Sequence, residues 1–416
     1  MPPQQPEPVV LDPTGACRHA EHTRLRAHGP TVPVDILGVT AHAVTDPALL
    51  KELLTSPDVS KDGRVHWPRF HEVVETWPLA LWINVENMFT AAGGNHRRLR
   101  RMIAPAFSAR RIAALTSTVE SIVEGILDTL EARPAGETTD LRQHLAYPVP
   151  ITVIGHLLGL PADRMDGFRA VVDGIFSTTL TAAQADDNNR ALYEVISELV
   201  AAKRAAPGED LISHLIGVRD SEGDGDGLTE GELLGTVVLV LSAGYETTVN
   251  VIDQAISLLL THPEQRAQLS AGNATWTDAV EETLRLEPPV THVPLRFAIN
   301  PIHLPNGKSI ARGDAILASL GAANVHPGWH GETASDYDIT RASKDHLAFG
   351  HGMHFCLGAT LARLEVTSVL RALFDRFPEI ELAVPAAELK PLNSLISNGH
   401  QSLPVRLRPT PSGEGA

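Results

Sequence analysis

The sequence predicts a mainly α-helical protein with a small β region. Several stretches carry apolar residues at three- and four-residue spacing, and the longest of them runs from Thr229 to about His262. Stretches that alternate apolar and polar residues are short and fall in three places, at about residues 31–44, 296–311 and 392–407. No long linker divides the chain, so these elements are compatible with one large core.

The first half of the chain is expected to hold a hairpin followed by helices. Residues 31–44 predict two short strands, and Asp46 is placed to cap a helix that ends near Leu54. Residues 56–91 predict a long loop with short helical pieces, and loops of that length are often functional. Further helices are predicted to open at His96 and to cover residues 112–130, 141–160 (interrupted by Pro148 and Pro150), 163–179 and 185–204.

The second half contains the longest predicted helix. Thr229 and Glu232 form a capping box at its start, and Pro263 follows its end. At 1.5 Å per residue this helix would be about 50 Å long, and its apolar centre should be buried. Other helices are expected at residues 277–286 and from Cys356 to about residue 377, and residues 392–407 predict a hairpin with Asn398-Gly399 at its turn.

Composition restricts the class of protein. Of 416 residues 43% are hydrophobic and 20% are charged, as in soluble globular proteins, and the net charge of −16 argues against nucleic acid as a partner. Two distant cysteines form no disulfide framework, which fits a reducing cytoplasm. The N-terminal residues lack the basic and apolar regions of a signal peptide, and the apolar runs are too short for a bilayer. We therefore expect a cytoplasmic protein that is not bound to a membrane.

One short stretch, residues 349–358, indicates chemistry. It places Cys356 among three glycines, two histidines and two phenylalanines, directly before a helical pattern. Glycines allow a tight loop, and the N-terminus of a helix favours a thiolate over a thiol. Such a thiolate suits a soft metal centre, for which heme iron is one candidate. A buried, inert cysteine at the start of a helix is the alternative interpretation.

This stretch resembles the heme-binding loop of the cytochrome P-450 family, Phe-x-x-Gly-x-(Arg/His)-x-Cys-x-Gly, at Phe349, Gly352, His354, Cys356 and Gly358. The resemblance extends over about residues 30–407. It implies a single-domain cytochrome P-450 fold in which heme b (iron protoporphyrin IX) lies between the long central helix and the helix after Cys356, the iron ligand. It also implies a heme-thiolate domain at residues 30–408, a disordered or loosely packed segment at 1–29, and a disordered tail at 409–416.

A second motif lies in the centre of the long helix, where Glu246, Thr247 and Thr248 interrupt an apolar run. A buried carboxylate is costly without partners or a role, although Glu246 on an exposed face remains an alternative. The fragment resembles the family's oxygen-activating motif, (Ala/Gly)-Gly-x-(Asp/Glu)-Thr. By this resemblance Ala243 and Gly244 lie at the oxygen-binding groove. Thr247 and ordered water deliver protons for O–O cleavage, and Glu246 links them to solvent.

Glu282 and Arg285 are three residues apart on one predicted helical face. They form either an exposed ion pair or the family's Glu-x-x-Arg motif. The resemblance adds Arg341 as the third member of a structural triad that anchors the thiolate loop.

Basic residues are expected at the carboxylate edge of the heme. His96 and Arg100 share a helical face and resemble the family's propionate contact, as do Arg296 and His354. A wider basic cluster could dock an acidic ferredoxin, and it comprises Arg97, Arg98, Arg101, Arg110, Arg111 and Arg363.

The resemblance also implies a substrate pocket lined by apolar residues, although each of them is equally compatible with the core. The candidates are Met88, Val240, Ala243, Val290, Val293, Leu395 and Ile396. His292 and Asn398 are either polar contacts in that pocket or ordinary loop residues. A large apolar substrate of steroid or macrolide/polyketide type is expected.

The implied activity is that of a monooxygenase that uses O2 and electrons from NAD(P)H, passed through a ferredoxin reductase and ferredoxin. A peroxide-driven peroxygenase and a non-catalytic heme sensor remain alternatives, and neither requires the Glu246–Thr247 pair.

Overall fold

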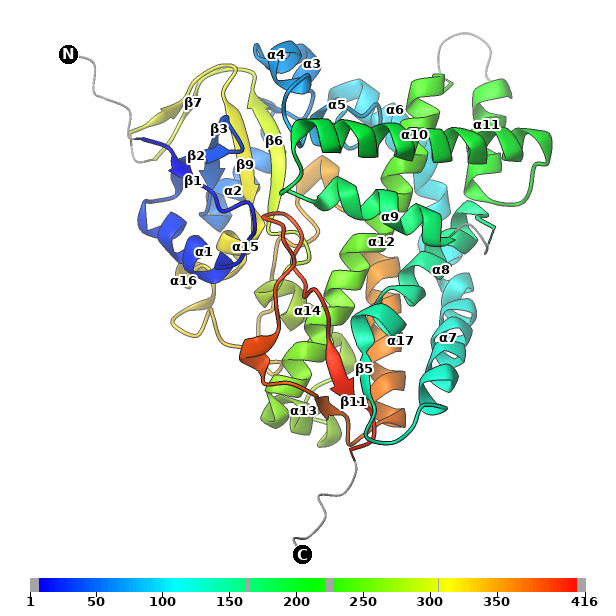
Figure 1. Cartoon of the computed structure of the whole chain (residues 1–416). Coiled ribbons are helices and arrows are strands. Elements are labelled where there is room, and N and C mark those ends of the chain that lie inside the picture. The colour runs from blue at the N-terminus through cyan, green and yellow to red at the C-terminus, as the bar shows by residue number, and fades with distance from the viewer. Residues whose placement is uncertain (1–6, 162–164, 222–226, 306, 410–416) are drawn as a thin grey trace, which may run out of the picture.

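The computed structural model describes residues 7–161, 165–221, 227–305 and 307–409. The fold is mainly helical with small sheets, as the sequence predicts. Helix α12 passes through the middle of the molecule, and the largest sheet lies to one side of it together with α1 and α2 (Figure 1).

The described helices have the following bounds: α1 (Arg18–Ala27), α2 (Pro47–Thr55), α3 (Gly63–His66), α4 (Phe70–Val74), α5 (Leu81–Asn84), α6 (Gly93–Ile103), η1 (Ala104–Phe107), α7 (Ala109–Glu131), η2 (Arg142–Ala146), α8 (Pro148–Leu158), α9 (Met165–Phe176), α10 (Ala182–Ala205), α11 (Leu211–Ser221), α12 (Glu230–Thr261), α13 (Pro263–Ser270), α14 (Trp276–Leu286), α15 (Leu320–Asn324), α16 (Pro327–His330), η4 (Gly352–His354), α17 (Ala359–Arg376) and η5 (Ala386–Glu388).

The described strands are β1 (Val9–Val10), β2 (Thr31–Ile36), β3 (Val39–Val44), β4 (Val59–Ser60), β5 (Thr138–Asp140), β6 (His292–Ala298), β7 (Ile302–His303), β8 (Ser309–Ile310), β9 (Ala315–Ser319), β10 (Glu381–Leu382) and β11 (Pro404–Arg406). The six-stranded sheet has the order β1-β2-β3-β9-β6-β4, and smaller sheets join β10-β11-β5 and β7-β8. The predicted hairpin is confirmed as β2 and β3, which pair antiparallel from Thr31 opposite Val44 to Ile36 opposite Val39.

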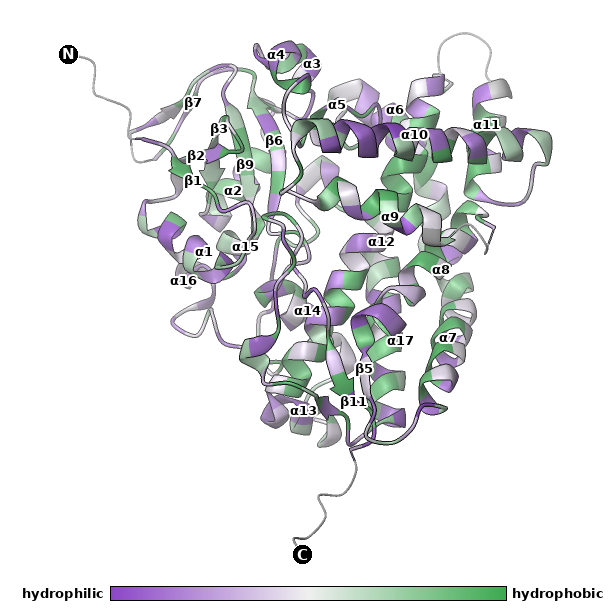
Figure 2. Ribbon diagram, in the orientation of Figure 1, coloured by the Kyte–Doolittle hydropathy of each residue, from purple (hydrophilic) through white to green (hydrophobic). Residues whose placement is uncertain are grey.

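Helix α12 begins as predicted, because the Thr229 hydroxyl and the Glu232 carboxylate each accept a hydrogen bond from the other residue's backbone N–H. Its most apolar 18-residue window has the length and composition of a membrane span, but 78% of that window is buried within the protein. Helices α8, α10, α14 and α17 pack around it, so α12 is the central core helix. The strands beside it are mostly hydrophobic, whereas α10 carries many hydrophilic residues (Figure 2).

The predicted helix at residues 141–160 is divided in two. Residues Arg142–Ala146 form a π-helical turn, and α8 begins at Pro148, where a proline without an N–H is tolerated. Gly159 ends α8 in the left-handed conformation, at φ 70°. The wider turn brings Arg142 against the middle of α12, and this contact becomes important below.

The expectation for the N-terminal segment is wrong where the structure describes it, and the predicted tail lies almost wholly outside the described residues. Residues 7–29 are not loosely packed, because β1 pairs with β2, and Leu11 and Leu25 belong to the main hydrophobic core. Arg18 of α1 donates hydrogen bonds to the carbonyls of Ser394 and Ser397, each at 3.1 Å. Residues 1–6 and 410–416 lie outside the described residues.

The C-terminal hairpin is also corrected. Within residues 392–407 only β11 is a strand, and it pairs with β5 and β10 instead of with the preceding residues. Asn398 does not form a tight turn, because its side chain is buried and bonded to Glu287, Gln254 and Arg18. Polar side-chain partners from distant elements therefore override the local turn signal of Asn398-Gly399.

Candidate active site

The loop that carries Cys356 is folded tightly against the end of α2. Gly350 and Gly352 have φ values of 71° and 72°, and a Cβ on Gly352 would lie 2.8 Å from the carbonyl oxygen of Leu54. The backbone N–H of Cys356 donates to the Phe349 carbonyl at 2.9 Å and closes the loop. The two glycines thus allow the chain to reverse and present Cys356 toward a cavity that Phe349, Phe355 and Gly358 also line.

The surroundings of Cys356 correct one expectation. Burial raises the pKa of its thiol, while the backbone N–H groups of Gly358 and Ala359 and the charges of Arg100 and Arg363 lower it. The helix N-terminus alone therefore does not produce a thiolate here. A bound metal cation would supply the missing positive charge, since thiolate ligation and deprotonation are coupled.

Buried basic groups lie at one edge of this cavity without a counter-ion. Both ring nitrogens of His96 and Nη1 of Arg296 are buried with no hydrogen-bond partner. Lys61 donates to the carbonyls of Pro294 and Leu295 at 2.6 and 3.0 Å. Among the described residues, no carboxylate forms an ion pair with Lys61, Arg100 or Arg296. Buried cations require compensation, so this edge is suited to an anionic ligand.

The pKa shifts in this group have the same cause. Burial lowers the pKa of Arg296 to about 10. The pKa of His354 falls to about 2 because of burial and then the charges of Arg296, His96 and Lys61. The His96 and His354 rings lie 4.3 Å apart between centroids. All four predicted propionate contacts, including Arg100, line the cavity, and the sequence analysis missed Lys61.

A heme fits this donor set. Its two propionates would match the uncompensated cations, and its iron would match the sulfur of Cys356 in the same lining. Glu365 of α17 also lines the cavity, and burial raises its pKa well above the usual range, which favours the uncharged acid. No motif pointed to Glu365 or Lys61, because each lies outside the Cys356 loop and the predicted basic helix.

The middle of α12 forms another wall. Ala243, Gly244, Thr247 and Thr248 line the cavity, and the Thr247 hydroxyl donates to the Ala243 carbonyl at 2.7 Å. Glu246 is buried but is not part of this lining. The predicted acid and alcohol therefore lie on different faces of one helix, and the alternative of an exposed Glu246 is wrong.

Glu246 is held by several partners on its own face. Its Oε1 accepts from Asn250 at 3.2 Å and from Ser397 at 3.3 Å, and Arg142 lies 3.6 Å away. Burial raises the pKa of Glu246 to about 7, although Arg142 opposes the shift. A carboxyl with this pKa exchanges protons near neutral pH, as a general acid requires.

The predicted triad comes together in the structure. Both carboxylate oxygens of Glu282 accept from Arg285 at 2.7 Å, and Arg341 Nε reaches Oε1 at 3.3 Å. Arg285 also donates to the carbonyls of Ala334 and Asp336. Neither Glu282 nor Arg285 is exposed, so the alternative of an exposed ion pair is wrong. The triad fixes the segment around residues 334–341.

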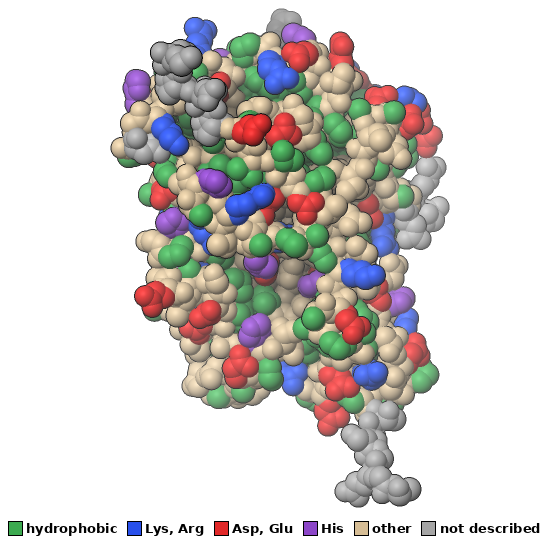
Figure 3. Space-filling model, turned by 60° about the vertical axis from the view of Figure 1, so that its left-hand side comes forward, with side chains coloured by type: hydrophobic (Ala, Val, Ile, Leu, Met, Phe, Trp, Pro, Cys, Tyr) green, Lys and Arg blue, Asp and Glu red, His purple; other side chains and the backbone are tan. Residues whose placement is uncertain are grey.

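Two arginines of the predicted docking cluster are already paired. Arg363 forms a bidentate ion pair with Glu281, at 2.5 and 2.9 Å, and its guanidinium lies 4.4 Å from the Phe349 ring centroid. Arg98 is paired with Glu232. These two residues therefore serve internal contacts, whereas Arg97, Arg101, Arg110 and Arg111 are exposed. Elsewhere charges of both signs are mixed, as on the face in Figure 3.

Five of the predicted substrate residues, Met88, Val240, Ala243, Val290 and Val293, line the cavity, together with Trp82, Phe89 and Phe176. Leu395 and Ile396 are buried and are not part of the lining. Hydrogen bonds fix the backbone of this loop: the Thr178 hydroxyl accepts one from the Leu395 N–H, and the Thr291 hydroxyl donates one to the Leu395 carbonyl.

Of the two alternatives left open for His292 and Asn398, a polar contact in the pocket is wrong. His292 is buried against Ser319, and Asn398 is buried in the polar cluster described above. Neither side chain faces the cavity.

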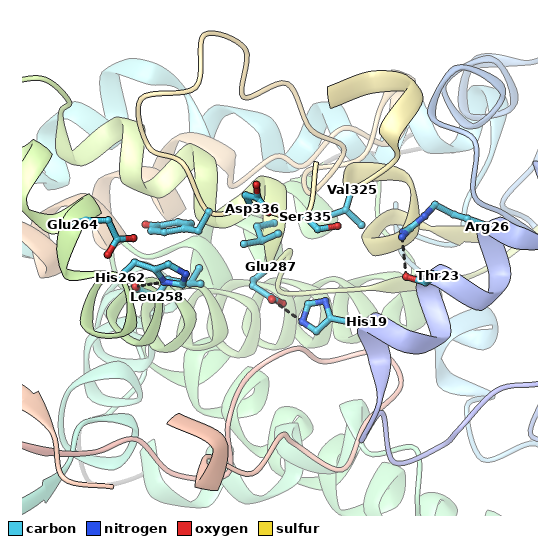
Figure 4. A pocket seen from close by; sticks show the side chains of 12 residues that line it. His19, Thr23, Arg26, Leu258, His262, Glu264, Glu287, Val325, Ser335 and Asp336 are labelled. Atoms are coloured by element: carbon cyan, nitrogen blue, oxygen red, sulfur yellow. Dashed lines mark hydrogen bonds and ion pairs between the residues drawn. The ribbon is translucent and has the colours of Figure 1, made fainter. Parts of the chain in front are cut away.

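A second cavity lies between α1, the end of α12, and residues 335–337. It has a volume of about 600 Å³, against about 260 Å³ for the cavity at Cys356. Its polar side chains are largely engaged with neighbours, as in the His19–Glu287 pair at 2.9 Å and the contact of Arg26 with Thr23 (Figure 4). It contains no cysteine and no side chain of the predicted site, so it does not match the predicted reaction centre.

Comparisons with known proteins agree with this geometry. A family model described as Cytochrome P450 matches residues 181–271 and 276–394. The solved structure of CYP154A1 from Streptomyces coelicolor A3(2) is 62% identical, covers 96% of this chain and 100% of its own, and superposes with a TM-score of 0.94.

Two curated relatives extend the similarity. The 2-hydroxy-5-methyl-1-naphthoate 7-hydroxylase of Streptomyces carzinostaticus is 37% identical over 96% of this chain and 98% of its own. The vitamin D(3) 25-hydroxylase of Pseudonocardia autotrophica is 35% identical over 94% of both chains.

Proposed function

The chain belongs to the cytochrome P450 family of monooxygenases, and from this premise we propose that it hydroxylates a sizeable apolar substrate, using O2 and electrons from a ferredoxin. The observation that carries the proposal is that Cys356 and Thr247, from two distant elements, line the same mostly apolar cavity. A soft metal ligand and an alcohol thereby face one volume from which water can be displaced.

The cofactor we propose is heme b. Cys356 would ligate its iron, and His96, Arg100, Arg296, His354 and Lys61 would hold its propionates. When bound, the heme supplies the redox chemistry that activates O2. The Glu282–Arg285–Arg341 triad acts on this site indirectly, because it fixes the segment before the Cys356 loop.

Thr247 and Glu246 would deliver protons to the cavity. The Thr247 hydroxyl bonds to the carbonyl of Ala243 at rest, and it can turn to hold a water molecule or to donate into the cavity. Glu246 cannot reach the cavity from its present partners, so its proton would travel through water or Thr247. Splitting acid and alcohol between two faces keeps the carboxylate out of the apolar substrate volume.

Aromatic and aliphatic side chains would orient the substrate. Trp82, Phe89, Phe176, Val240 and Val290 line the cavity with few polar groups. Such a lining binds by apolar contact and shape. The relatives named above hydroxylate a naphthoate and vitamin D(3), and a substrate of steroid or macrolide/polyketide type fits the same class of cavity.

The monooxygenase proposal is tested with Thr247→Ala. The heme-bound variant should still consume NAD(P)H with its redox partners but release peroxide in place of product, because proton delivery is impaired. Thr248→Ala is the matched control, since Thr248 lines the same wall and bonds to Gly244 at 3.4 Å. Unimpaired product formation by Thr247→Ala, or product formed from peroxide alone at the rate with NAD(P)H, would favour a peroxygenase. A carbon monoxide adduct without the thiolate signature would remove the heme-thiolate site itself.

The electron donor is proposed to dock near the exposed arginines at the start of α7. Arg110→Glu/Arg111→Glu should slow reduction by ferredoxin at low salt, because opposite charges steer association. Arg312→Glu, on the turn between β8 and β9, is the control and should leave reduction unchanged. Equal rates for both variants would place the donor elsewhere.

We propose that the described core from β1 to β11 is one catalytic unit, and that the protein works in the cytoplasm. The core cluster, which includes both Leu11 and Leu407, supports the first statement. The burial of α12 and the free cysteines support the second.

A further inference from the structure

A stripe of buried polar residues follows one face of α12. Glu246, Asn250, Asp253 and Gln254 have spacings that place them on the same side of a helix, and none is more than 7% exposed. This side faces η2 and residues 397–400, away from the cavity that Ala243 and Thr247 line. A row of polar groups in a helix this apolar needs partners or a function.

Arg142 joins the two carboxylates of the stripe. Its Nη1 lies 3.3 Å from Asp253 Oδ2 and its Nη2 lies 3.6 Å from Glu246 Oε1. The same Nη2 donates to Asn250 at 2.9 Å, and Nε donates to Tyr147 at 3.3 Å. Only 1% of the Arg142 side chain is exposed, so the guanidinium is a fixed charge between two acids.

The cluster reaches the surface at His400. Its Nδ1 lies 3.1 Å from Asp253 Oδ2, and its backbone N–H donates to the same oxygen at 2.6 Å. The His400 side chain is 15% exposed, whereas Asp253 is fully buried. Glu246 Oε2 and Asp253 Oδ1 are buried without hydrogen-bond partners. Each acid thus has one oxygen that can take up a proton or accept a hydrogen bond from an ordered water molecule.

We propose that Arg142 is a positioning residue that sets the proton affinity and orientation of Glu246, and that Asp253 and His400 connect this acid to solvent. This inference rests on the proposed function. A proton that leaves Glu246 toward Thr247 is replaced by one that enters from solvent at His400, so the charge of the cluster is restored after each transfer.

Other charged groups near Glu246 also influence its pKa. Asp173 on α9 raises the pKa of Glu246, and Arg142 lowers it, while burial is the largest influence. Arg169 on α9 pairs with Asp173 at 3.8 Å and lies 3.7 Å from the Tyr147 ring centroid. Tyr245 and Tyr147 stay neutral because burial raises the pKa of each phenol. Arg142 is therefore the cation that directly opposes protonation of Glu246.

The first test measures Glu246 itself in the resting, heme-bound protein. The infrared carbonyl stretch of the protonated acid, assigned by its loss in Glu246→Gln, is followed across pH. Arg142→Met should move its titration midpoint upward by about one pH unit or more, a tenfold change in proton affinity. Arg142→Lys should restore part of the shift. Arg133→Met, which removes an arginine that pairs with Glu137 and contacts His144 of η2 and no group of the cluster, should leave the midpoint in place. A midpoint that is unchanged in Arg142→Met would overturn the positioning role.

The second test concerns the solvent end. His400→Gln removes the ring but keeps the backbone N–H bond to Asp253. It should leave the Glu246 midpoint in place, lower the product formed per NAD(P)H, and release the difference as peroxide. Full coupling in His400→Gln would overturn the connection to solvent.

Two further measurements separate a refutation of this inference from a variant that does not fold and from failure of the proposed function. If Arg142→Met does not fold, Arg142→Met/Asp253→Asn removes the same cation without leaving Asp253 charged, and the same upward shift is expected. The carbon monoxide spectrum of the unmodified protein is recorded in parallel. Loss of the thiolate signature there would refute the proposed function, whereas a normal signature with unshifted variants would refute only this inference.

Discussion

The tight contact between the Cys356 loop and α2 allows a stability prediction with internal controls. Gly272, which follows the end of α13, and Gly350 and Gly352 have nearly equal φ values of 73°, 71° and 72°. A Cβ would meet nothing within 4 Å at Gly272, and would lie 3.7 Å from the His354 carbonyl oxygen at Gly350. At Gly352 it would lie 2.8 Å from the backbone carbonyl of Leu54. Alanine at the three sites separates the cost of the backbone conformation from the cost of the clash.

The expected magnitudes follow from these distances. A left-handed conformation costs an L-residue about 1–2 kcal/mol, and the reduced entropy of the unfolded chain offsets part of it, so Gly272→Ala and Gly350→Ala should each lose about 1 kcal/mol. Gly352→Ala adds a clash with backbone that cannot rotate away, and overpacking of this kind costs about 1–3 kcal/mol more. The total loss for Gly352→Ala should be about 2–4 kcal/mol.

Urea unfolding of the three variants, monitored by circular dichroism, measures these differences. The rate of heme transfer to an acceptor protein tests whether the loop is displaced, and it should rise in Gly352→Ala and not in Gly272→Ala. Equal stability losses at Gly272 and Gly352 would refute the argument that the Cys356 loop is held by its contact with Leu54.

Three further outcomes follow from contacts described above. Glu281→Gln should cost about 3 kcal/mol near neutral pH, because the partners Arg363 and His346 outweigh burial and lower the Glu281 pKa from 4.5 to about 2. That contribution is fully present above pH 4.5 and lost as pH falls toward 2, so urea midpoints of the variant and the parent should converge in acid; a constant gap would contradict it. Arg285→Met should cost about 3–5 kcal/mol, since it leaves Glu282 charged and buried, whereas Glu282→Leu/Arg285→Met should cost less than the sum of its single changes in a double-mutant cycle. Val240→Phe should shrink the cavity and weaken binding of large apolar ligands, measured by the spin-state shift of the heme, and Val237→Phe, buried on the same helix outside the lining, is the control that should leave ligand selection unchanged.

Much of the fold was predictable because its signals are local. The capping box at Thr229 and the alternation in residues 31–44 depend on neighbouring residues, and both elements formed where they were predicted. The hairpin at Asn398 failed because its turn signal is equally local but weaker than the contacts of Asn398 with Arg18, Gln254 and Glu287. The prediction of a loosely packed N-terminal segment failed because the contacts that hold it, with β2 and with Ser394 and Ser397, are tertiary, and the last two partners lie more than 370 residues away.

In the candidate site too, residues in local motifs were predicted, whereas residues placed only by tertiary contacts were not. Residues inside short motifs, such as His354 and Cys356, lie at one cavity. Lys61 was missed because a single lysine in an irregular loop carries no pattern, and only the tertiary structure shows that it is buried beside Arg296. Glu246 was recognised as an acid, but a sequence motif does not specify that acid and alcohol occupy opposite environments. The partner that compensates the buried Glu246 is Arg142, which lies in a π-helical turn with no clear sequence signature.

The bond from Arg18 to the carbonyls of Ser394 and Ser397 spans most of the polypeptide. During synthesis on the ribosome, the first helix therefore waits for nearly the entire chain before it meets its partner. Closure of such a long loop is slow relative to local helix formation. Residues 394–397, which pair with Val290 beside the cavity, are therefore expected to reach their final place at the end of folding. Cofactor capture can then proceed while one side of the cavity is still unformed, and docking of the last segment would trap the bound group.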